Sequence, residues 1–400
     1  MKHQTNGEAE RPTVHVLAAL NRSYVPIFGV MAQSLFEHRD PARSYEVIVL
    51  SLDVTDDDLR AIKVATTPRG DAGGTFDVRV AALDAFSAKI EQASPSPGFT
   101  REVFFRLLAP QALPDIHRAV YLDSDLVVLD DVAKIYDEDL RGAVIGACVD
   151  PGMAGMVGGY DPDELARLRD VVGMDDPYGY FSAGVLVMDL DAMRHELDGD
   201  ELLAAAADPR MRYNDQDALN RLCQGGRVHY LDMRWNTLFD SEGVRVRDIV
   251  PHAPARIQQA YRAARKNPAI FHYAGPYKPW NRDVDGSELF WEEARRSPCY
   301  ESVLGRYATS LVSESHKETF DKVWKTFDDL YFKSSEAERI QHDLHLRTSE
   351  LERRVDELQR QVERLEADNR QLRAEKTPLS ARVINRVRAA RDDERDKGRD

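Results

Sequence analysis

The sequence has few of the features that mark secreted, membrane-spanning or thiolate-zinc proteins. Of its 400 residues three are cysteines, Cys148, Cys223 and Cys299, and no two of them form a C-x-x-C pair. This argues against a disulfide framework and a zinc site, so we expect buried free thiols. No apolar run approaches the roughly 20 residues of a membrane span, and the start, MKHQTNGEAERPT, has no signal-peptide-like stretch. We therefore expect a cytoplasmic protein.

Basic charge is scarce in the main part of the chain. The net charge of the sequence is -15. Residues 337–400 hold 16 of the 54 Lys and Arg and 15 of the 69 Asp and Glu, which leaves 38 basic and 54 acidic side chains in the first 336 residues. Because nucleic-acid binding needs a basic surface, we expect no nucleic-acid partner. A phosphorylated ligand would need a metal and a few local cations.

Strand and helix patterns alternate regularly along the first part of the chain. The segment 55–65 is predicted as a helix with Thr55 as its cap, because acidic residues fill its first turn. Short apolar runs are typical of buried strands, and they lie at 14–20, 45–52, 75–83, 143–150, 180–190, 228–235 and 269–275. This order predicts an α/β fold with a mostly parallel sheet covered by helices on both faces.

One further predicted strand carries acidic residues. Residues 117–131, HRAVYLDSDLVVLDD, are predicted as a single buried strand interrupted by Asp123 and Asp125 near its ligand-facing end. Side chains at i and i+2 of an extended segment point the same way, so both carboxylates face one point. Two close carboxylates need a cation between them, and hard oxygen ligands suit Mg²⁺ or Mn²⁺. A bare D-x-D pattern is common, so a metal site needs a third ligand.

A later segment, FHYAGPYKPWN at 271–281, supplies a candidate for that ligand. His272 ends an apolar strand, and an imidazole beside two carboxylates shifts the preference from Mg²⁺ towards Mn²⁺. Lys278 is a candidate point charge for a phosphate. Taken alone, these residues also suit a strand-end histidine satisfied by hydrogen bonds and a surface lysine. In the same way, Asp215 and Gln216 of RYNDQDALN also suit an ordinary helix N-terminus.

Seven motifs follow one another along the chain: AALNRSYVPIFGVMAQSL, FFRLLAP, AVYLDSDLVVLDDV, YFSAGVLVMDL, NDQDALN, WN and HYAGPYKPWN. In this order they resemble the motifs of glycosyltransferase family 8, the retaining GT-A enzymes that include bacterial lipopolysaccharide galactosyltransferases and glycogenin. The resemblance covers about residues 13–285. It implies a GT-A fold, a Rossmann-like, mostly parallel sheet with helices on both faces. The implied reaction moves a hexose, galactose or glucose, from a UDP-sugar.

The resemblance also implies roles for individual residues. Asp123, Asp125 and His272 would bind Mn²⁺, with Mg²⁺ as the alternative. The implied donor contacts are Ala19, Asn21 and Tyr24 at the uridine, Arg106 and Ser182 at the sugar, and Gly275 and Lys278 at the diphosphate. The implied catalytic residues around the donor sugar are Asp150, Asp215 and Gln216. Asn21, Ser23 and Ser182 depart from the family's usual Asp, Asn and Asn, which alters the expected contacts to the base and the sugar.

The implied reaction keeps the α configuration of the sugar. No carboxylate here is an obvious nucleophile, and the amide of Gln216 is a weak one. We therefore expect front-face attack by a hydroxyl of a saccharide or glycolipid acceptor, with a UDP oxygen helping to remove its proton. The metal and Lys278 would stabilise the charge on the departing UDP.

Heptads replace the strand and helix alternation near the C-terminus. We expect a flexible leader at 1–12, the GT-A domain at 13–285, a helical extension at 286–336, a parallel coiled coil at 337–375 and a charged tail at 376–400. The heptads place Val355, Val362 and Asn369 at a, and Leu344, Leu351, Leu358, Leu365 and Leu372 at d. This pattern favours a two-stranded coil and hence a homodimer. The tail is expected to be solvated, although its basic part also suits peripheral contact with the inner face of a membrane.

Two other classes of function are alternatives. Haloacid-dehalogenase-like phosphatases carry a similar D-x-D-x-[TV] strand end, with Asp123 as nucleophile and Asp125 as acid or base. That motif usually ends the first strand of its core, whereas several predicted elements precede it here, and it leaves H-x-x-G-x-x-K-P-W unexplained. The second alternative is a catalytically silent sugar-nucleotide-binding or scaffold protein assembled by the coil. It predicts UDP binding without turnover.

Overall fold

The structure, a computed structural model, describes most of the first 311 residues and a short part of the C-terminal region. The described residues are 12–68, 73–93, 95–96, 99–240, 243–311, 348, 351–360 and 362. The chain divides into two units, residues 1–314 and 315–400. Nearly all of the predicted leader, the second half of the helical extension, most of the predicted coil and the whole tail lie outside the described residues.

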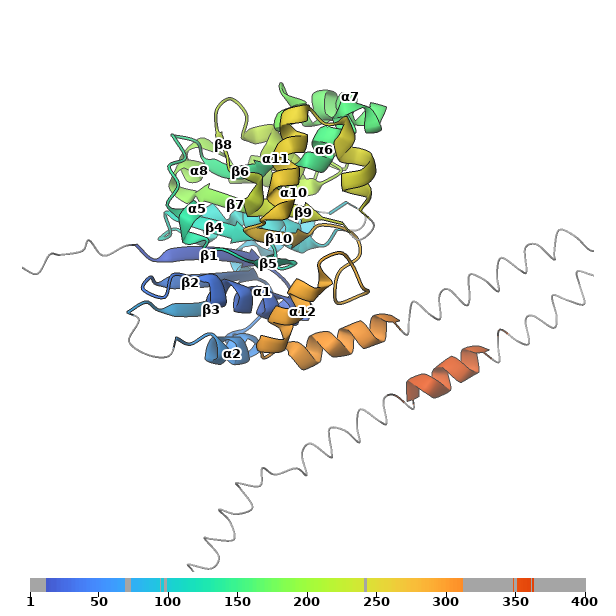
Figure 1. Ribbon diagram of the computed structural model, residues 1–400. Helices are drawn as coiled ribbons and strands as arrows, with labels where there is room; N and C mark the ends of the chain where they lie inside the picture. Colours follow the sequence, from blue (N-terminus) through green and yellow to red (C-terminus); the bar gives the residue numbers. More distant parts are fainter. Residues whose placement is uncertain are drawn as a thin grey trace, which may run out of the picture. The chain divides into compact units, whose positions relative to one another are not determined.

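A seven-stranded sheet of order β3-β2-β1-β4-β7-β6-β8 is the centre of the first unit (Figure 1). Its strands are β1 (Val14–Ala19), β2 (Tyr45–Ser51), β3 (Phe76–Ala82), β4 (Arg118–Leu122), β6 (Ile145–Val149), β7 (Phe181–Asp189) and β8 (Val228–Tyr230). Strand β1 is parallel to β2 and β4, β2 to β3, and β6 to β8, whereas β7 runs antiparallel to β4 and β6. The prediction of a mostly parallel sheet is confirmed.

Helices connect these strands. The labelled α-helices are α1 (Val25–His38), α2 (Asp56–Ala65), α3 (Ser87–Gln92), α4 (Phe105–Ala112), α5 (Ala133–Tyr136), α6 (Pro151–Gly155), α7 (Pro162–Arg167), α8 (Leu190–Glu196), α9 (Gly199–Ala206), α10 (Asn214–Leu222), α11 (Ala255–Lys266) and α12 (Ser287–Arg296). Helix α2 begins where predicted. The backbone N–H and the hydroxyl of Thr55 both donate to Asp58 Oδ2, at 2.8 and 2.7 Å, which closes its first turn.

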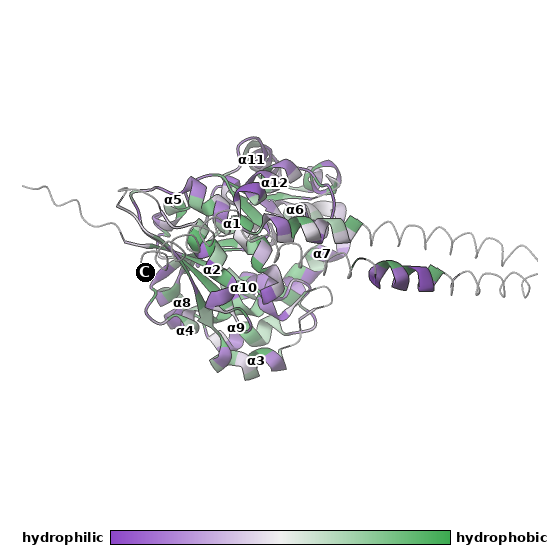
Figure 2. Ribbon diagram, turned by 90° about the horizontal axis from the view of Figure 1, so that it is seen from below, coloured by the Kyte–Doolittle hydropathy of each residue, from purple (hydrophilic) through white to green (hydrophobic). Residues whose placement is uncertain are grey.

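Both faces of the sheet are covered, as predicted. Alternate residues of β1 enter different cores: Val16 packs with α1 on one face and Leu17 packs with α4 on the other. Figure 2 shows α1 and α12 on one side of the sheet and α4, α8 and α9 on the other. Burial on both faces explains why the central strands are apolar at nearly every position.

The stretch 117–131 forms two strands, so the prediction of a single strand is wrong. Strand β4 ends at Leu122, and β5 (Leu126–Val128) belongs to a separate three-stranded sheet of order β5-β10-β9. There β5 pairs antiparallel with β10 (Ile270–Tyr273), which is parallel to β9 (Thr237–Phe239). Asp123 N–H donates to Gly184 O at 2.9 Å, and the chain then leaves the large sheet. The polar residues 123–125 therefore lie where the chain changes sheets.

The strand predicted at 228–235 is also shorter than expected. Strand β8 ends at Tyr230, and a 3₁₀ turn follows at Met233–Asn236. The carboxylate of Asp232 accepts from Arg234 N–H at 2.9 Å and so begins the turn. This local bond competes with continued strand pairing.

Helices follow the last strand. Helix α12 and the helical residues 300–311 fall within the predicted helical extension. In the second unit residues 351–360 are helical, and the predicted d residues Leu351 and Leu358 are 52% and 47% exposed in the single chain. Among the described helices none is both long and apolar enough to cross a membrane.

Candidate active site

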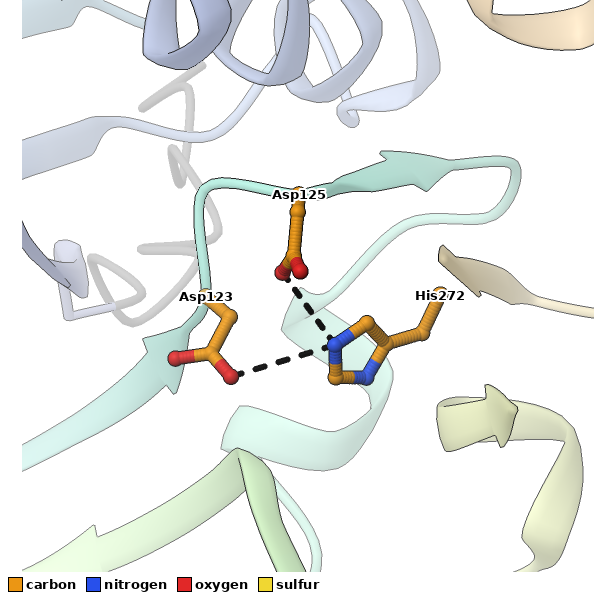
Figure 3. Close-up of side chains that lie close together, drawn as sticks. All are labelled: Asp123, Asp125 and His272. Atoms are coloured by element: carbon orange, nitrogen blue, oxygen red, sulfur yellow. Dashed lines mark ion pairs between the residues drawn. The ribbon is translucent and has the colours of Figure 1, made fainter. Parts of the chain in front are cut away.

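Three side chains that suit a metal ion meet at the point where the chain changes sheets. Asp123 and Asp125 flank the turn between β4 and β5, and His272 lies on β10, paired with Leu126 of β5. His272 Nε2 lies 3.2 Å from Asp125 Oδ1 and 3.8 Å from Asp123 Oδ2 (Figure 3). One ligand atom from each residue falls within 4.8 Å of the others. Strands of two sheets thus bring together the three residues that the sequence analysis combined.

A glycine of β7 makes room for this cluster. A Cβ atom at Gly184 would lie 2.3 Å from His272 Cε1 and 2.9 Å from Asp123 Oδ2. Both distances are shorter than van der Waals contact, so a side chain at this position would displace the imidazole or the carboxylate. This close approach gives a physical reason for the small residues of the F-S-A-G-V segment.

Arg106 of α4 binds one carboxylate of the cluster. Its guanidinium donates to Asp123 Oδ1 at 2.9 Å and to Ala183 O at 2.5 Å, and its Nε lies 2.8 Å from Asp215 Oδ2. Burial alone would lower the pKa of Arg106, but Asp123 and Asp215 outweigh burial and raise it. Burial raises the pKa of Asp215 to about 6, although Arg106 opposes that shift. These residues form one buried charge network, in which Arg106 links the cluster of Asp123, Asp125 and His272 to α10.

Lys278 binds the other carboxylate. Its Nζ donates to Asp125 Oδ2 at 2.5 Å and to Tyr273 O at 2.5 Å. Burial would raise the pKa of Asp125, but Lys278 and His272 outweigh it and hold that pKa well below its usual range. The lysine expected at a diphosphate therefore neutralises a predicted metal ligand in this structure.

Asp215, Gln216 and Asp217 lie in the first turn of α10, which packs against β7. Gln216 Oε1 accepts from Ala183 N–H at 3.0 Å, and its Nε2 donates to the Tyr180 hydroxyl at 3.3 Å. That hydroxyl in turn donates to Asp217 at 2.6 Å, and Asp217 pairs with Arg167 at 2.7 Å. The amide of Gln216 is therefore held in one orientation beside the backbone of β7.

Three other predicted residues lie at the end of the large sheet where β1 and β6 end and β7 begins. Asp150 follows β6, and its Oδ1 accepts from the N–H groups of Gly152 and Met153. Ser182 is buried near the start of β7, and Ala19 ends β1. Gly275 follows β10 in the loop that leads to Lys278. This placement agrees with ligand binding at the carboxyl ends of the parallel strands.

The residues expected at the uridine form a local turn. Asn21 Oδ1 accepts from the N–H of Ser23 at 3.1 Å and from its hydroxyl at 2.6 Å. Tyr24 packs edge-on against Trp280, with ring centroids 6.3 Å apart. Arg306, from the helix at 300–311, lies 5.2 Å over the Tyr24 ring and donates to Ser23 O at 3.3 Å. A residue beyond the predicted GT-A domain thus reaches this turn.

Tyr121 and Asn236 also contact residues of the cluster, although the sequence analysis gave them no role. The Tyr121 hydroxyl donates to Asp123 Oδ1 at 2.9 Å. Asn236 Oδ1 lies 2.8 Å from His272 Nδ1, on the side of the ring away from the carboxylates. The signal for Tyr121 is its place two residues before Asp123 on one strand, and the signal for Asn236 is the W-N motif, to which no role had been given.

The sequence matches one family model and several known proteins. The family model described as "Glycosyl transferase family 8" matches residues 15–284. General stress protein A of Bacillus subtilis is 24% identical over 277 residues, which cover 68% of this chain and 88% of that protein. Lipopolysaccharide 1,2-glucosyltransferase of Escherichia coli is 27% identical over 188 residues, covering 46% of this chain and 50% of that one.

Among solved structures, the galactosyltransferase LgtC in complex with donor and acceptor sugar analogs aligns with a TM-score of 0.56 and 25% identity, covering 71% of this chain and 96% of that one. The fold, a mostly parallel central sheet with helices on both faces, matches that of the GT-A glycosyltransferases. Because the family model matches more than half of the chain, the chain belongs to glycosyltransferase family 8.

Proposed function

We propose that this protein transfers a hexose, galactose or glucose, from a UDP-sugar to a hydroxyl group of a saccharide or glycolipid, and that the new bond keeps the α configuration. The observation that carries the proposal is the cluster of Asp123, Asp125 and His272 with Lys278 directly beside it. A nucleotide diphosphate is a ligand that a divalent cation and an adjacent amine can bind together. The names of the relatives, a glucosyltransferase and a galactosyltransferase, support a hexose.

The donor set suits Mn²⁺, with Mg²⁺ as the alternative. Two carboxylates and one imidazole within 4.8 Å combine hard oxygen ligands with a nitrogen ligand, which favours Mn²⁺. When bound, such an ion stabilises negative charge on the diphosphate oxygens. Asp123 and Asp125 would hold it through oxygen atoms and His272 through Nε2.

The other residues would bind and orient the donor. Lys278 would exchange its contact with Asp125 for a phosphate oxygen. Arg106, already fixed by Asp123 and Asp215, would donate to sugar hydroxyls from a rigid position. Ala19, Asn21 and Tyr24 would contact the uridine, Gly275 the diphosphate, and Asp150 and Ser182 the sugar.

The environment of Gln216 supports front-face attack. Its Oε1 already accepts a hydrogen bond from Ala183 N–H, which lowers the nucleophilicity of an amide that is weak to begin with. In the proposed step the acceptor oxygen forms a bond to the anomeric carbon while the bond from that carbon to the diphosphate breaks. The proton of the acceptor hydroxyl passes to the departing diphosphate oxygen. Gln216 and Asp215 would then orient the sugar rather than bond to it.

The C-terminal region is proposed to assemble the enzyme. The described helix at 351–360 leaves Leu351 and Leu358 exposed, as the d positions of an unpaired coiled-coil strand would be. We propose a parallel homodimer through residues 337–375. Peripheral contact of the basic tail at 376–400 with the inner face of a membrane is an additional proposal, and it would bring the enzyme close to a glycolipid acceptor.

A panel of UDP-sugars tests this function without knowledge of the acceptor. Purified protein is incubated with UDP-galactose, UDP-glucose and other UDP-sugars, with Mn²⁺ or with a chelator, and the released UDP is measured. Slow hydrolysis of one UDP-hexose, stopped by the chelator, is the expected result. UDP binding without any UDP release would favour the silent binding protein, and release of phosphate from small phosphoesters would favour phosphatase chemistry.

A further inference from the structure

Both ring nitrogens of His272 have polar side chains close to them. Nε2 faces Asp125 and Asp123, and Nδ1 lies 2.8 Å from Asn236 Oδ1. Both partners of this second contact are buried: Asn236 is 3% exposed and His272 is 4% exposed. Solvent therefore has little access to the contact, and the amide is the group that meets Nδ1.

The location of Asn236 makes the contact rigid. Asn236 ends the 3₁₀ turn at Met233–Asn236 and directly precedes β9, the strand that pairs with β10. In that pairing Leu238 is opposite His272, so two hydrogen-bonded strands hold the backbones of the amide and the imidazole in register. The neighbouring hydroxyl of Thr237 donates to Met233 O at 3.2 Å and helps to fix the turn.

We propose that Asn236 is a positioning residue for the metal site: its Oδ1 accepts the Nδ1–H of His272 and so keeps the Nε2 lone pair free for a cation. An amide oxygen accepts and does not donate, so the imidazole proton belongs on Nδ1 when Oδ1 faces the ring. With the opposite tautomer, Nε2 would carry the proton and point N–H at Asp125, and it could not bind a metal. The proposal rests on the proposed function, because it assigns a role within the same site.

Binding measurements on variants separate this role from a merely structural one. Asn236→Leu keeps the approximate volume and removes the acceptor, so Mn²⁺ affinity in the presence of UDP should fall about 10- to 100-fold. Asn236→Asp keeps an acceptor at Nδ1 and should bind Mn²⁺ at least as tightly as wild type. Thr237→Val is the matched control: it removes a neighbouring buried hydrogen bond without touching His272, and Mn²⁺ affinity should stay within about twofold. Electron paramagnetic resonance of free Mn²⁺ gives the dissociation constants.

A measurement on the wild-type protein keeps the proposal testable if Asn236→Leu does not fold. In protein labelled with ¹⁵N-histidine and loaded with diamagnetic Mg²⁺ and UDP, the His272 ring should show a protonated Nδ1 and a proton-free Nε2. The His272 signals are assigned from the spectrum of His272→Gln.

The outcomes distinguish the inference from the proposed function. Wild-type protein that binds no divalent cation in the presence of UDP would contradict both. If wild type binds Mn²⁺ and Asn236→Leu binds it equally well, the inference alone is wrong. It is equally wrong if folded Asn236→Asp binds Mn²⁺ as poorly as Asn236→Leu, or if the proton of His272 is found on Nε2 in the loaded protein.

Discussion

Replacing Lys278 with methionine should change metal binding and UDP binding in opposite directions. In the structure Lys278 Nζ lies 2.5 Å from Asp125 Oδ2, with the two side chains 16% and 18% exposed. A divalent cation that uses Asp125 must compete with this ammonium group. In Lys278→Met the competitor is absent and the carboxylate lacks a counter-ion, so Mn²⁺ should bind more tightly when no nucleotide is present.

The size of the effect follows from the geometry of the pair. Removing one partner of a fully buried ion pair costs about 3–5 kcal/mol, and exposed pairs contribute about 0–1 kcal/mol. Because this pair is mostly buried and His272 also faces Asp125, we expect about 1–3 kcal/mol, or roughly 5- to 150-fold tighter Mn²⁺ binding. UDP loses a charged contact, so at saturating Mn²⁺ its affinity should fall by a comparable factor.

Two titrations test this prediction. Free Mn²⁺ is followed by electron paramagnetic resonance without nucleotide, and UDP binding is followed by calorimetry at saturating Mn²⁺. Lys134→Met is the matched control, because Lys134 pairs with Asp130 at 2.6 Å but its own side chain is 59% exposed, and neither affinity should change. If Lys278→Met binds Mn²⁺ no better than wild type, the idea that Lys278 competes for Asp125 is wrong.

Three other predictions concern the site, the thiols and a helix cap. Asp125→Asn should reduce UDP release at least about 100-fold while the protein stays folded, and substantial remaining activity would exclude Asp125 as a metal ligand. Burial raises the pKa of Cys223 to about 12 and raises that of Cys148 further, so neither thiol should react with Ellman's reagent in the native protein, and both should react in guanidinium. Fast native reaction at either would contradict their burial. Thr55→Ala should lower the free energy of unfolding by about 1 kcal/mol in urea, and an unchanged midpoint would argue against the cap.

The assembly prediction concerns the C-terminal heptads. Full-length protein should have the mass of a dimer in light scattering, and protein truncated after residue 336 should have the mass of a monomer. A truncated protein that remains dimeric would show that another surface holds the two chains together.

Much of the fold could be predicted because its signals are local. The apolar runs of β1 and β2 and the capping residues of α2 determine elements through neighbours in sequence, and they appear where expected. The single strand expected at 117–131 was wrong for a non-local reason. Its two apolar halves have similar composition, but β4 pairs with β1 and β7, whereas β5 pairs with β10, which lies more than 140 residues later.

The sequence was enough to predict which residues form the candidate site, but not which side chains contact them. The spacing of Asp123 and Asp125 and the strand-end position of His272 indicated three ligands. Their sequence neighbours include no Lys or Arg, yet folding brings Arg106 to Asp123 and Lys278 to Asp125. Contacts of this kind depend on loop and side-chain geometry at the edges of two sheets, which no local pattern encodes. The same holds for the orientation of His272 by an amide 36 residues earlier.

Anomalous scattering can show directly whether Asp123, Asp125 and His272 together hold a divalent cation. Crystals grown with Mn²⁺ and UDP are measured on both sides of the manganese absorption edge. We expect one strong anomalous peak between the two carboxylates and His272 Nε2, with Lys278 turned from Asp125 to the diphosphate. UDP bound in the crystal with no manganese peak at these three side chains, or with the peak elsewhere, would contradict this expectation.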